Sequence, residues 1–180
     1  MRALLGAVWT IMNPRYPHTL VLEYGVDHTG EMDIQIDITE PDIALFTKLS
    51  PSHIEGFGTA EKYFAEKEKI LRRKIKQTYA IGNSDDRHQS DFVCQSWYGT
   101  DTKKSDYTMA DIQEFPDRTE FTLLHGEEKY CIVTPILGKH HAGLIAGAFM
   151  VALQMDILPL DIVSFLRHIH LPHARGNTLK

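Results

Sequence analysis

The sequence predicts an α/β domain in which a mostly parallel sheet is flanked by helices and carries a small antiparallel β subsheet. Two apolar runs, Leu20–Gly25 and Ile43–Thr47, do not alternate with polar residues, which is typical of strands covered on both faces. Segments with the three- and four-residue spacing of amphipathic helices lie before and after these runs. From about residue 91 to 135, short β-type runs separated by turns indicate the antiparallel subsheet.

Length and composition fit one domain that spans residues 1–180. The hydrophobic share of 43% and the charged share of 24% are ordinary for a globular protein. A formal net charge of −5 without a long basic run argues against nucleic acid as a partner, and no apolar run approaches the ~18 residues of a membrane span. Cys94 and Cys131 are too few for a disulfide framework, so we expect both to be reduced and packed on strands in a cytoplasmic protein.

The N-terminal part is predicted as a helix, a strand, a crossover and a second strand. The helix ends at Pro14, and its apolar residues are Ala3, Leu4, Ala7, Val8, Ile11 and Met12. Leu20–Gly25 and Ile43–Thr47 are the two buried strands. Between them, Asp33–Thr39 alternates polar and apolar residues as a strand would. Because the crossover between two parallel strands is usually helical, we predict a helix here despite the alternation.

Polar residues follow both predicted strands at their carboxyl ends. Glu23 lies at the end of the first strand and His53 just after the second. In open α/β sheets, ligands bind at the carboxyl edge. A carboxylate and an imidazole delivered there by successive strands predict a site for a metal ion or a phosphate.

A long helix is expected after Thr59, which is a good N-cap. Its apolar stripe consists of Ala60, Tyr63, Phe64, Ile70 and Leu71. Lys67 interrupts this stripe, because seven residues are almost two helical turns and place Lys67 on the same side as Ala60. An inward lysine is costly unless it snorkels or finds a partner. Two hypotheses stay open: a snorkelling stem at the helix margin, or an amine aimed at the edge that carries Glu23 and His53.

The rest of the chain is predicted as a third strand, the subsheet and two closing helices. Tyr79–Gly82 is the third strand, and a turn follows it. The runs that make up the subsheet are Phe92–Trp97, Tyr107–Ile112, Glu120–Leu124 and Tyr130–Thr134. The residues expected on the buried face of the first closing helix are Leu144, Ile145, Ala148, Phe149, Ala152 and Leu153. Gly143 and Gly147 allow this helix to pack closely on the sheet, and the second helix follows Pro159.

The order of motifs along the chain resembles the central domain of the Mur ligase family. The matching segments are VLEYGVDHTGEMD, PDIALFTKLSPSHIEGFGT, AEKEKIL, NSDD, TEFTLL and TPILGKHHAGLIAGAFMVAL. The resemblance covers essentially the whole chain and implies a P-loop-nucleotidase-like sheet. It also implies ATP-dependent amide formation in peptidoglycan precursor synthesis. In this chemistry, ATP phosphorylates a carboxylate of a UDP-linked muramoyl peptide, an amino acid or dipeptide amine attacks the acyl phosphate, and Mg²⁺ offsets the phosphate charge.

The resemblance assigns roles to five residues of this sequence. Glu23 and His53 match family positions that hold magnesium, and Lys67 matches a lysine that many members carry as a carbamate. These three are the expected catalytic residues. His140 and Arg175 match positions that contact the nucleotide.

The sequence departs from the family pattern at the nucleotide site. A Gly-rich phosphate loop ending in Gly-Lys-Thr or Gly-Lys-Ser is expected upstream of the first helix and is not found, and the only Gly-Lys pair, Gly138-Lys139, is followed by His140. His141 and Leu144 replace two family asparagines, and Lys48 stands where an asparagine is common. We therefore expect a central domain separated from its flanking domains, inactive alone, with exposed apolar surface that favours self-association.

Two other hypotheses stay open. A degenerate domain could serve as a binding or oligomerisation module, which the missing phosphate loop favours and the retained metal-site positions oppose. A transition-metal site could form from His168, His170 and His173 near His140. We favour ordinary surface histidines, because His168 and His170 do not share a helix face and a structural zinc site normally includes cysteine.

Overall fold

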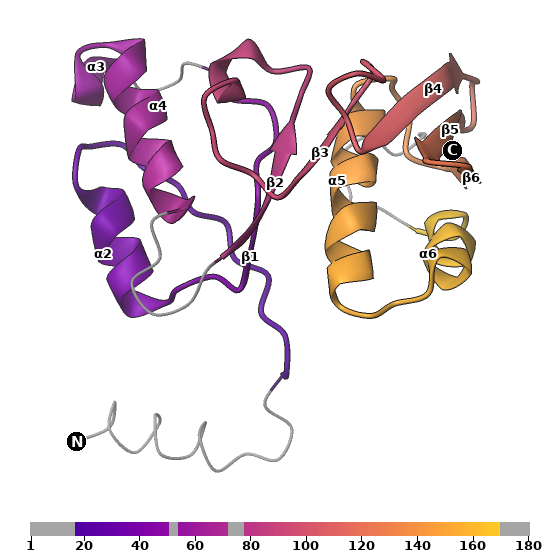
Figure 1. The fold of residues 1–180 in the computed structure, drawn as a ribbon, viewed down its shortest axis with the longest axis horizontal. Helices are drawn as coiled ribbons and strands as arrows, with labels where there is room; N and C mark the ends of the chain where they lie inside the picture. The colour runs from indigo at the N-terminus through magenta and orange to yellow at the C-terminus, as the bar shows by residue number, and fades with distance from the viewer. Residues whose placement is uncertain (1–16, 51–53, 72–77, 170–180) are drawn as a thin grey trace.

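The computed structural model describes residues 17–50, 54–71 and 78–169, which build a six-stranded sheet with helices on both sides (Figure 1). The strands follow one another across the sheet in chain order. They are β1 (Ile43–Leu45), β2 (Tyr79–Asn83), β3 (Ser96–Gly99), β4 (Tyr107–Glu114), β5 (Thr119–His125) and β6 (Glu128–Thr134).

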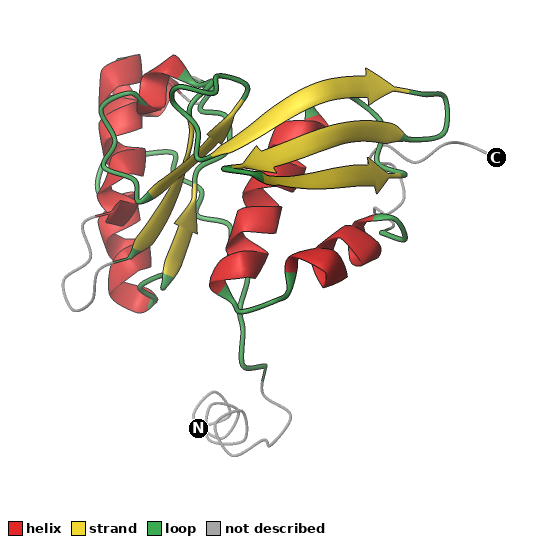
Figure 2. Cartoon of the chain, turned by 45° about the vertical axis from the view of Figure 1, so that its right-hand side comes forward, coloured by secondary structure: helices red, strands yellow, loops and turns green. Residues whose placement is uncertain are grey.

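The sheet changes from parallel to antiparallel pairing at β4 (Figure 2). β1, β2, β3 and β4 pair in parallel, with Ile43 opposite Tyr79 at the start of the ladder. β4, β5 and β6 form an antiparallel meander in which Phe121 lies opposite Ile132. The predicted fold class is confirmed. The antiparallel part covers 107–134 rather than 91–135, because β3 pairs in parallel with both of its neighbours.

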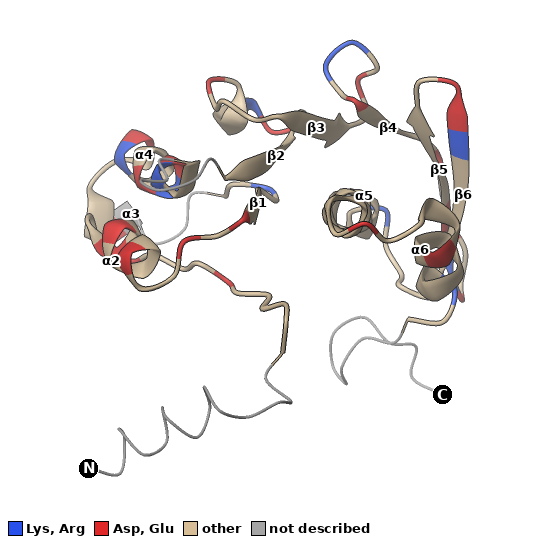
Figure 3. Cartoon of the chain, turned by 60° about the horizontal axis from the view of Figure 1, so that its bottom comes forward, with Lys and Arg blue, Asp and Glu red and all other residues tan. Residues whose placement is uncertain are grey.

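Helices cover both faces of the sheet (Figure 3). On one side lie α2 (Glu31–Ile38), α3 (Ile54–Phe57), α4 (Ala60–Glu68) and the 3₁₀ turn η1 (Lys69–Leu71), and on the other α5 (His141–Gln154) and α6 (Pro159–Leu166). The helix predicted after Thr59 is confirmed, with the Thr59 hydroxyl accepting a hydrogen bond from the Lys62 backbone N–H. Both closing helices are confirmed as well.

The apolar run that contains β1 is covered on both faces, as its sequence predicts. Ile43 and Leu45 pack with the core cluster around α5. Ala44 and Phe46 belong to the opposite cluster and pack with Phe64 of α4. Successive side chains of a strand point to opposite faces, so β1 contributes to both cores at once.

The main core lies between the sheet and the helices α5 and α6. Leu123 and Phe149 are at most 1% exposed there. Gly147 allows α5 to approach β1, because a Cβ added at this position would lie 2.8 Å from Leu45 Cδ1. Leu144, which was expected on the buried face, is 44% exposed, because α5 faces the sheet with Gly147 rather than with this leucine.

The segment Leu20–Gly25 is not the buried strand that its apolar run predicts. It runs without regular structure, and Val21 is 94% exposed. An extended segment becomes a strand through backbone hydrogen bonds to a neighbour, and no strand of the described sheet pairs with this one. The helix predicted for Asp33–Thr39 is nevertheless confirmed as α2, although it does not connect two paired strands.

Other expectations are corrected or lie outside the described residues. Both cysteines are free, as expected, but Cys94 packs just before β3 rather than on a strand, and Cys131 lies on β6 with its side chain exposed. Cys131 is exposed because it precedes the buried Ile132, and neighbouring strand residues face opposite sides. No helix in the described part of the chain is long and apolar enough to cross a membrane. The helix predicted upstream of Pro14 lies outside the described residues.

We expect Tyr98→Phe to lower the free energy of unfolding by about 1–3 kcal/mol. The buried Tyr98 hydroxyl donates a 2.9 Å hydrogen bond to the Phe46 carbonyl, and its removal leaves that carbonyl short of a partner. Urea unfolding followed by circular dichroism measures the change. Tyr130→Phe is the matched control, because its hydroxyl bonds the exposed Glu128 and its loss should cost less than about 0.5 kcal/mol. Equal losses in the two variants would contradict the importance of the buried bond.

Candidate functional site

Lys67 points inward from α4, and its ammonium group meets the N-terminal segment of the described chain. Lys67 Nζ donates a 2.9 Å hydrogen bond to the Tyr24 backbone carbonyl. The same amine lies 5.7 Å from the centre of the Tyr63 ring, which adds a cation–π contact. Tyr63 itself is buried against Phe57. The lysine that interrupts the apolar stripe therefore has a partner, and that partner follows Glu23 directly in the chain.

Glu23 lies at the rim of a shallow pocket formed by the N-terminal segment and α2. The lining residues are Leu22, Glu23, Tyr24, Gln35, Ile38 and Thr39. Side chains fix this segment to α2: the Tyr24 hydroxyl donates to the Thr39 carbonyl, and the Gln35 amide donates to the Gly25 carbonyl. The Glu23 side chain is exposed, so its carboxylate is open to a ligand from solution.

A buried carboxylate on α4 joins this helix to the start of α2. Glu66 is 2% exposed, and its Oε1 accepts hydrogen bonds from the backbone N–H groups of Gly30, at 2.9 Å, and Met32, at 3.0 Å. Its Oε2 lies 2.9 Å from Lys69 Nζ, which also contacts Asp33 at 2.6 Å. The first N–H groups of a helix have no partner within the helix and carry partial positive charge, so a carboxylate is stabilising there. Figure 3 shows basic and acidic positions side by side on α4 and acidic positions on α2.

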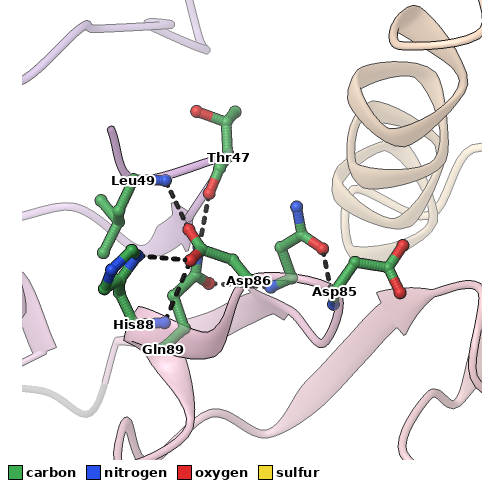
Figure 4. A network of polar contacts seen from close by, with 7 residues as sticks. Thr47, Leu49, Asp85, Asp86, His88 and Gln89 are labelled. Atoms are coloured by element: carbon green, nitrogen blue, oxygen red, sulfur yellow. Dashed lines mark hydrogen bonds and ion pairs between the residues drawn. The ribbon is translucent and has the colours of Figure 1, made fainter. Parts of the chain in front are cut away.

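A second buried carboxylate ties the end of β1 to the turn after β2 (Figure 4). Asp86 Oδ2 accepts from the Leu49 N–H at 2.5 Å and from the Gln89 amide at 3.1 Å. Asp86 Oδ1 accepts from the His88 N–H at 3.0 Å and lies 3.0 Å from His88 Nδ1. Gln89, fully buried in η2 (Arg87–Gln89), also donates to the Thr47 carbonyl. Both segments follow the carboxyl ends of parallel strands, so this network holds the edge where ligands bind in such sheets.

Hydrogen bonding decides the ionisation of Asp86. Burial by itself would raise the pKa of this carboxyl, but the N–H groups of Leu49 and His88 and the Gln89 amide outweigh it and lower the pKa. A carboxyl whose pKa is lowered on folding stabilises the fold above its unfolded pKa. That contribution is lost as the pH falls through the folded pKa, so the network should weaken only in acid.

The structure brings together some of the residues singled out in the sequence. Lys67 lies next to the backbone that carries Glu23, whereas His53 and Arg175 lie outside the described residues. His140 is exposed at the N-terminal end of α5, its ring 4.0 Å from that of His141, and α5 covers the opposite face of the sheet from α4. No hydrogen bond among the described residues links His140 to Glu23 or Lys67. The five assigned roles therefore stay predictions.

The described residues offer few ligands for the metals that the sequence suggested. The described residues hold no group of three or more His, Cys, Asp and Glu side chains that could bind a metal. His168 Nδ1 lies 3.1 Å from the Ser164 carbonyl, and His170 and His173 lie outside the described part. Magnesium beside a nucleotide takes one or two carboxylates, with phosphate and water oxygens completing its shell. An exposed carboxylate such as Glu23 fits that requirement.

The chain matches the family model of the Mur ligase middle domain over residues 7–152. The chain belongs to the Mur ligase family. Its curated relatives include the UDP-N-acetylmuramoyl-tripeptide–D-alanyl-D-alanine ligases of Bacillus subtilis and Escherichia coli. The first is 28% identical over 169 residues, covering 93% of this chain and 36% of the relative, and the second is 28% identical over 162 residues, covering 85% and 35%. The chain thus spans about a third of the length of these relatives.

Solved structures of the family share the fold of this Mur ligase domain. MurF from Acinetobacter baumannii matches with a TM-score of 0.78 at 23% identity, over 89% of this chain and 36% of that one. MurF from Thermotoga maritima, solved in complex with ADP, matches with a TM-score of 0.71 at 17% identity, over 86% and 36%. The motif order also resembles the enzyme that adds D-alanyl-D-alanine to the UDP-linked muramoyl tripeptide, and relatives of that name confirm this resemblance.

The two buried carboxylates, Glu66 and Asp86, are not among the residues singled out in the sequence. Glu66 precedes Lys67 in the AEKEKIL segment, which was matched to the family without a role for this residue. Asp86 belongs to the NSDD segment, which predicts a turn and marks the family. For Glu66, the available signal was its position next to the inward Lys67, because adjacent residues of a helix can approach the same neighbouring element.

We expect Asp86→Asn to lower the free energy of unfolding at pH 7 by about 1–3 kcal/mol, because an amide cannot accept all the hydrogen bonds that reach this buried carboxylate. The loss should shrink below the unfolded pKa of an aspartate, about 3.9, where the carboxylate contribution disappears in the wild type too. Urea unfolding at several pH values measures both effects.

Asp85→Asn is the matched control, because it removes the neighbouring charge from an exposed side chain whose hydrogen bonds, within the described part of the chain, go to Thr100 on the adjoining loop. A loss at Asp85 as large as that at Asp86, or a loss that does not depend on pH, would contradict the proposed network.

Proposed function

We propose that this chain is the central ATP- and magnesium-handling domain of an amide-forming ligase that acts on peptidoglycan precursors through an acyl phosphate. The observation that carries the proposal is the 2.9 Å contact between Lys67 Nζ and the Tyr24 carbonyl. It brings an inward amine next to Glu23, although 43 residues separate the two residues in hydrogen-bond contact. This contact supports a site in which Lys67 and Glu23, two of the three expected catalytic residues, act together.

Family relationships support the same chemistry. The chain belongs to the Mur ligases, and its relatives carry names of UDP-muramoyl-peptide ligases. A solved relative with the same fold binds ADP, the product that ATP leaves after phosphoryl transfer. The proposed substrates are ATP, a UDP-linked muramoyl peptide and an amino acid or dipeptide. The peptide carboxylate attacks the γ-phosphorus and ADP leaves, after which the amine attacks the acyl phosphate and inorganic phosphate leaves.

Each proposed residue has one task. Glu23, with His53, would hold magnesium, which when bound offsets phosphate charge and acts as a Lewis acid. Lys67 would react with carbon dioxide: its neutral amine forms an N–C bond, one proton is released, and the side chain becomes an anionic carbamate. The carbamate of Lys67 would orient cations or hydrogen-bond donors beside Glu23. His140 and Arg175 would contact the nucleotide.

The whole reaction is proposed for a longer polypeptide rather than for this chain alone. The chain spans about a third of its relatives' length, and we expect no amide formation from it by itself. Self-association and a cytoplasmic location stay predictions. The exposed apolar side chains of Leu20, Val21, Leu22 and Ile38 are the groups that would drive self-association.

A non-catalytic binding module is the second candidate function. The observation in its favour is that the one Gly-Lys pair, Gly138-Lys139, lies in the turn before α5, where the Gly138 N–H donates to the Thr119 hydroxyl. That glycine amide is committed to the sheet rather than free for a phosphate. Nucleotide binding decides between the two candidates.

We expect the chain to release or absorb heat when magnesium-ATP is added, and Glu23→Ala to abolish that heat, because the exposed carboxylate is the proposed metal ligand. Isothermal titration calorimetry makes the measurement. Glu127→Ala, in the exposed turn between β5 and β6, is the control and should leave the heat unchanged. No heat in the wild type, or equal heats in wild type and Glu23→Ala, would favour the binding module.

We expect a carbamate on Lys67 when the chain is equilibrated with ¹³C-bicarbonate, because this part-buried amine is held at a fixed place by its hydrogen bond to the Tyr24 carbonyl. Carbon-13 NMR should show a carbamate carbonyl signal separate from that of bicarbonate. The signal should be lost in Lys67→Arg and kept in Lys62→Arg, which changes an exposed lysine of the same helix. A signal that survives in Lys67→Arg would show that the carbamate forms elsewhere.

A further inference from the structure

The direction in which Lys67 points depends on how α4 is rotated about its own axis. Lys67 reaches Tyr24 only if the face of α4 that carries it is turned toward the N-terminal segment. Neighbouring residues of a helix are about 100° apart, so a residue next to Lys67 that is anchored on α2 sets that rotation. Glu66 is such a residue.

The anchor of Glu66 is specific in its geometry. One carboxylate oxygen accepts from both Gly30 and Met32, and the other faces Lys69. Gly30 and Met32 lie at the start of α2 and Lys69 lies in η1, so the carboxylate is held from more than one direction. Hydrogen bonds to the carboxylates of Asp33 and Glu66 raise the pKa of Lys69, so the cluster favours the charged ammonium.

The anchor also fixes the other side of the contact. α2 begins at Glu31, and the segment that carries Glu23 and Tyr24 leads into it. The Glu31 carboxylate accepts from the Asp27 and His28 backbone N–H groups at 2.7 and 3.1 Å, which shapes the turn between them. Glu66 therefore accepts hydrogen bonds from the end of the same turn that positions Tyr24.

We propose that Glu66 is the positioning residue for Lys67: it locks α4 onto the first turn of α2 and so holds the amine beside the segment that carries Glu23. This inference rests on the proposed function for the importance of Lys67. The contact itself can be tested without nucleotide, magnesium or carbon dioxide.

The test is the rate at which an amine-reactive acylating reagent modifies Lys67 in the whole chain, measured by mass spectrometry in bicarbonate-free buffer. Lys62, exposed on the same helix, is the internal reference. We expect Glu66→Ala to raise the Lys67 rate relative to Lys62 by about tenfold, as release from a locally ordered state predicts. Glu66→Gln keeps an oxygen that can accept from Gly30 and Met32, and it should stay within about twofold of the wild type.

Two controls separate positioning from general loss of stability. Glu68→Ala removes the next carboxylate of α4, which makes no hydrogen bond to α2 among the described residues, and should leave the ratio unchanged. Leu123→Ala destabilises the core on the α5 side without touching the Glu66 contacts, and in the folded chain it should leave the Lys67:Lys62 ratio unchanged. If Glu66→Ala does not fold, Glu66→Asp replaces it, because its side chain keeps the charge but is one methylene too short to reach Gly30.

The proposal would be overturned if Lys67 in a folded Glu66→Ala or Glu66→Asp chain were acylated no faster, relative to Lys62, than in the wild type. It would also be overturned if Leu123→Ala changed the Lys67:Lys62 rate ratio as much as Glu66→Ala does. Failure of the proposed function appears elsewhere, as a missing heat with magnesium-ATP. If the protection of Lys67 from acylation depends on Glu66, the positioning contact is supported, whatever the calorimetry shows.

Discussion

The buried carboxylate of Glu66 is the contact on which the geometry of the candidate site depends. A buried charge destabilises a fold unless hydrogen bonds and an opposite charge offset its loss of water. Glu66 meets both conditions only where α4 touches the first turn of α2, at Gly30 and Met32, with Lys69 beside it. This requirement leaves α4 little freedom to rotate. Lys67 faces Tyr24 as a consequence.

The two sides of the sheet are built by different kinds of contact. The side covered by α5 and α6 is an apolar core around Leu123 and Phe149, which resists change because its side chains are close-packed. The side covered by α2 and α4 combines smaller apolar clusters with the carboxylate contacts of Glu66 and Asp86. Hydrogen bonds have direction, so this second side can fix individual residues in space. The proposed chemistry uses the second side.

Membership in the Mur ligase family agrees with this division. The family model covers the sheet and most of α5, and solved MurF structures share the arrangement. The departures from the family pattern concern phosphate binding rather than the fold. The one Gly-Lys pair, Gly138-Lys139, lies in the turn that leads into α5. Because the chain spans about a third of its relatives' length, catalysis is proposed for a longer polypeptide, and the described domain holds Lys67 against the backbone of Tyr24.

Local patterns in the sequence determined the elements and the fold class. Thr59 marks the start of α4, the run around Ile43–Leu45 marks a strand covered on both faces, and the spacing of Lys67 shows that it points inward. These properties depend on residues close together in the chain, so periodicity and capping rules reveal them. Tertiary structure decided the rest. Leu20–Gly25 carries the apolar pattern of a strand and is not one, because strand formation needs a hydrogen-bonded neighbour that the segment itself does not contain. Glu66 and Asp86 are ordinary acidic residues in the sequence, and they become buried anchors only because backbone N–H groups 34 and 37 residues away reach them in the folded chain.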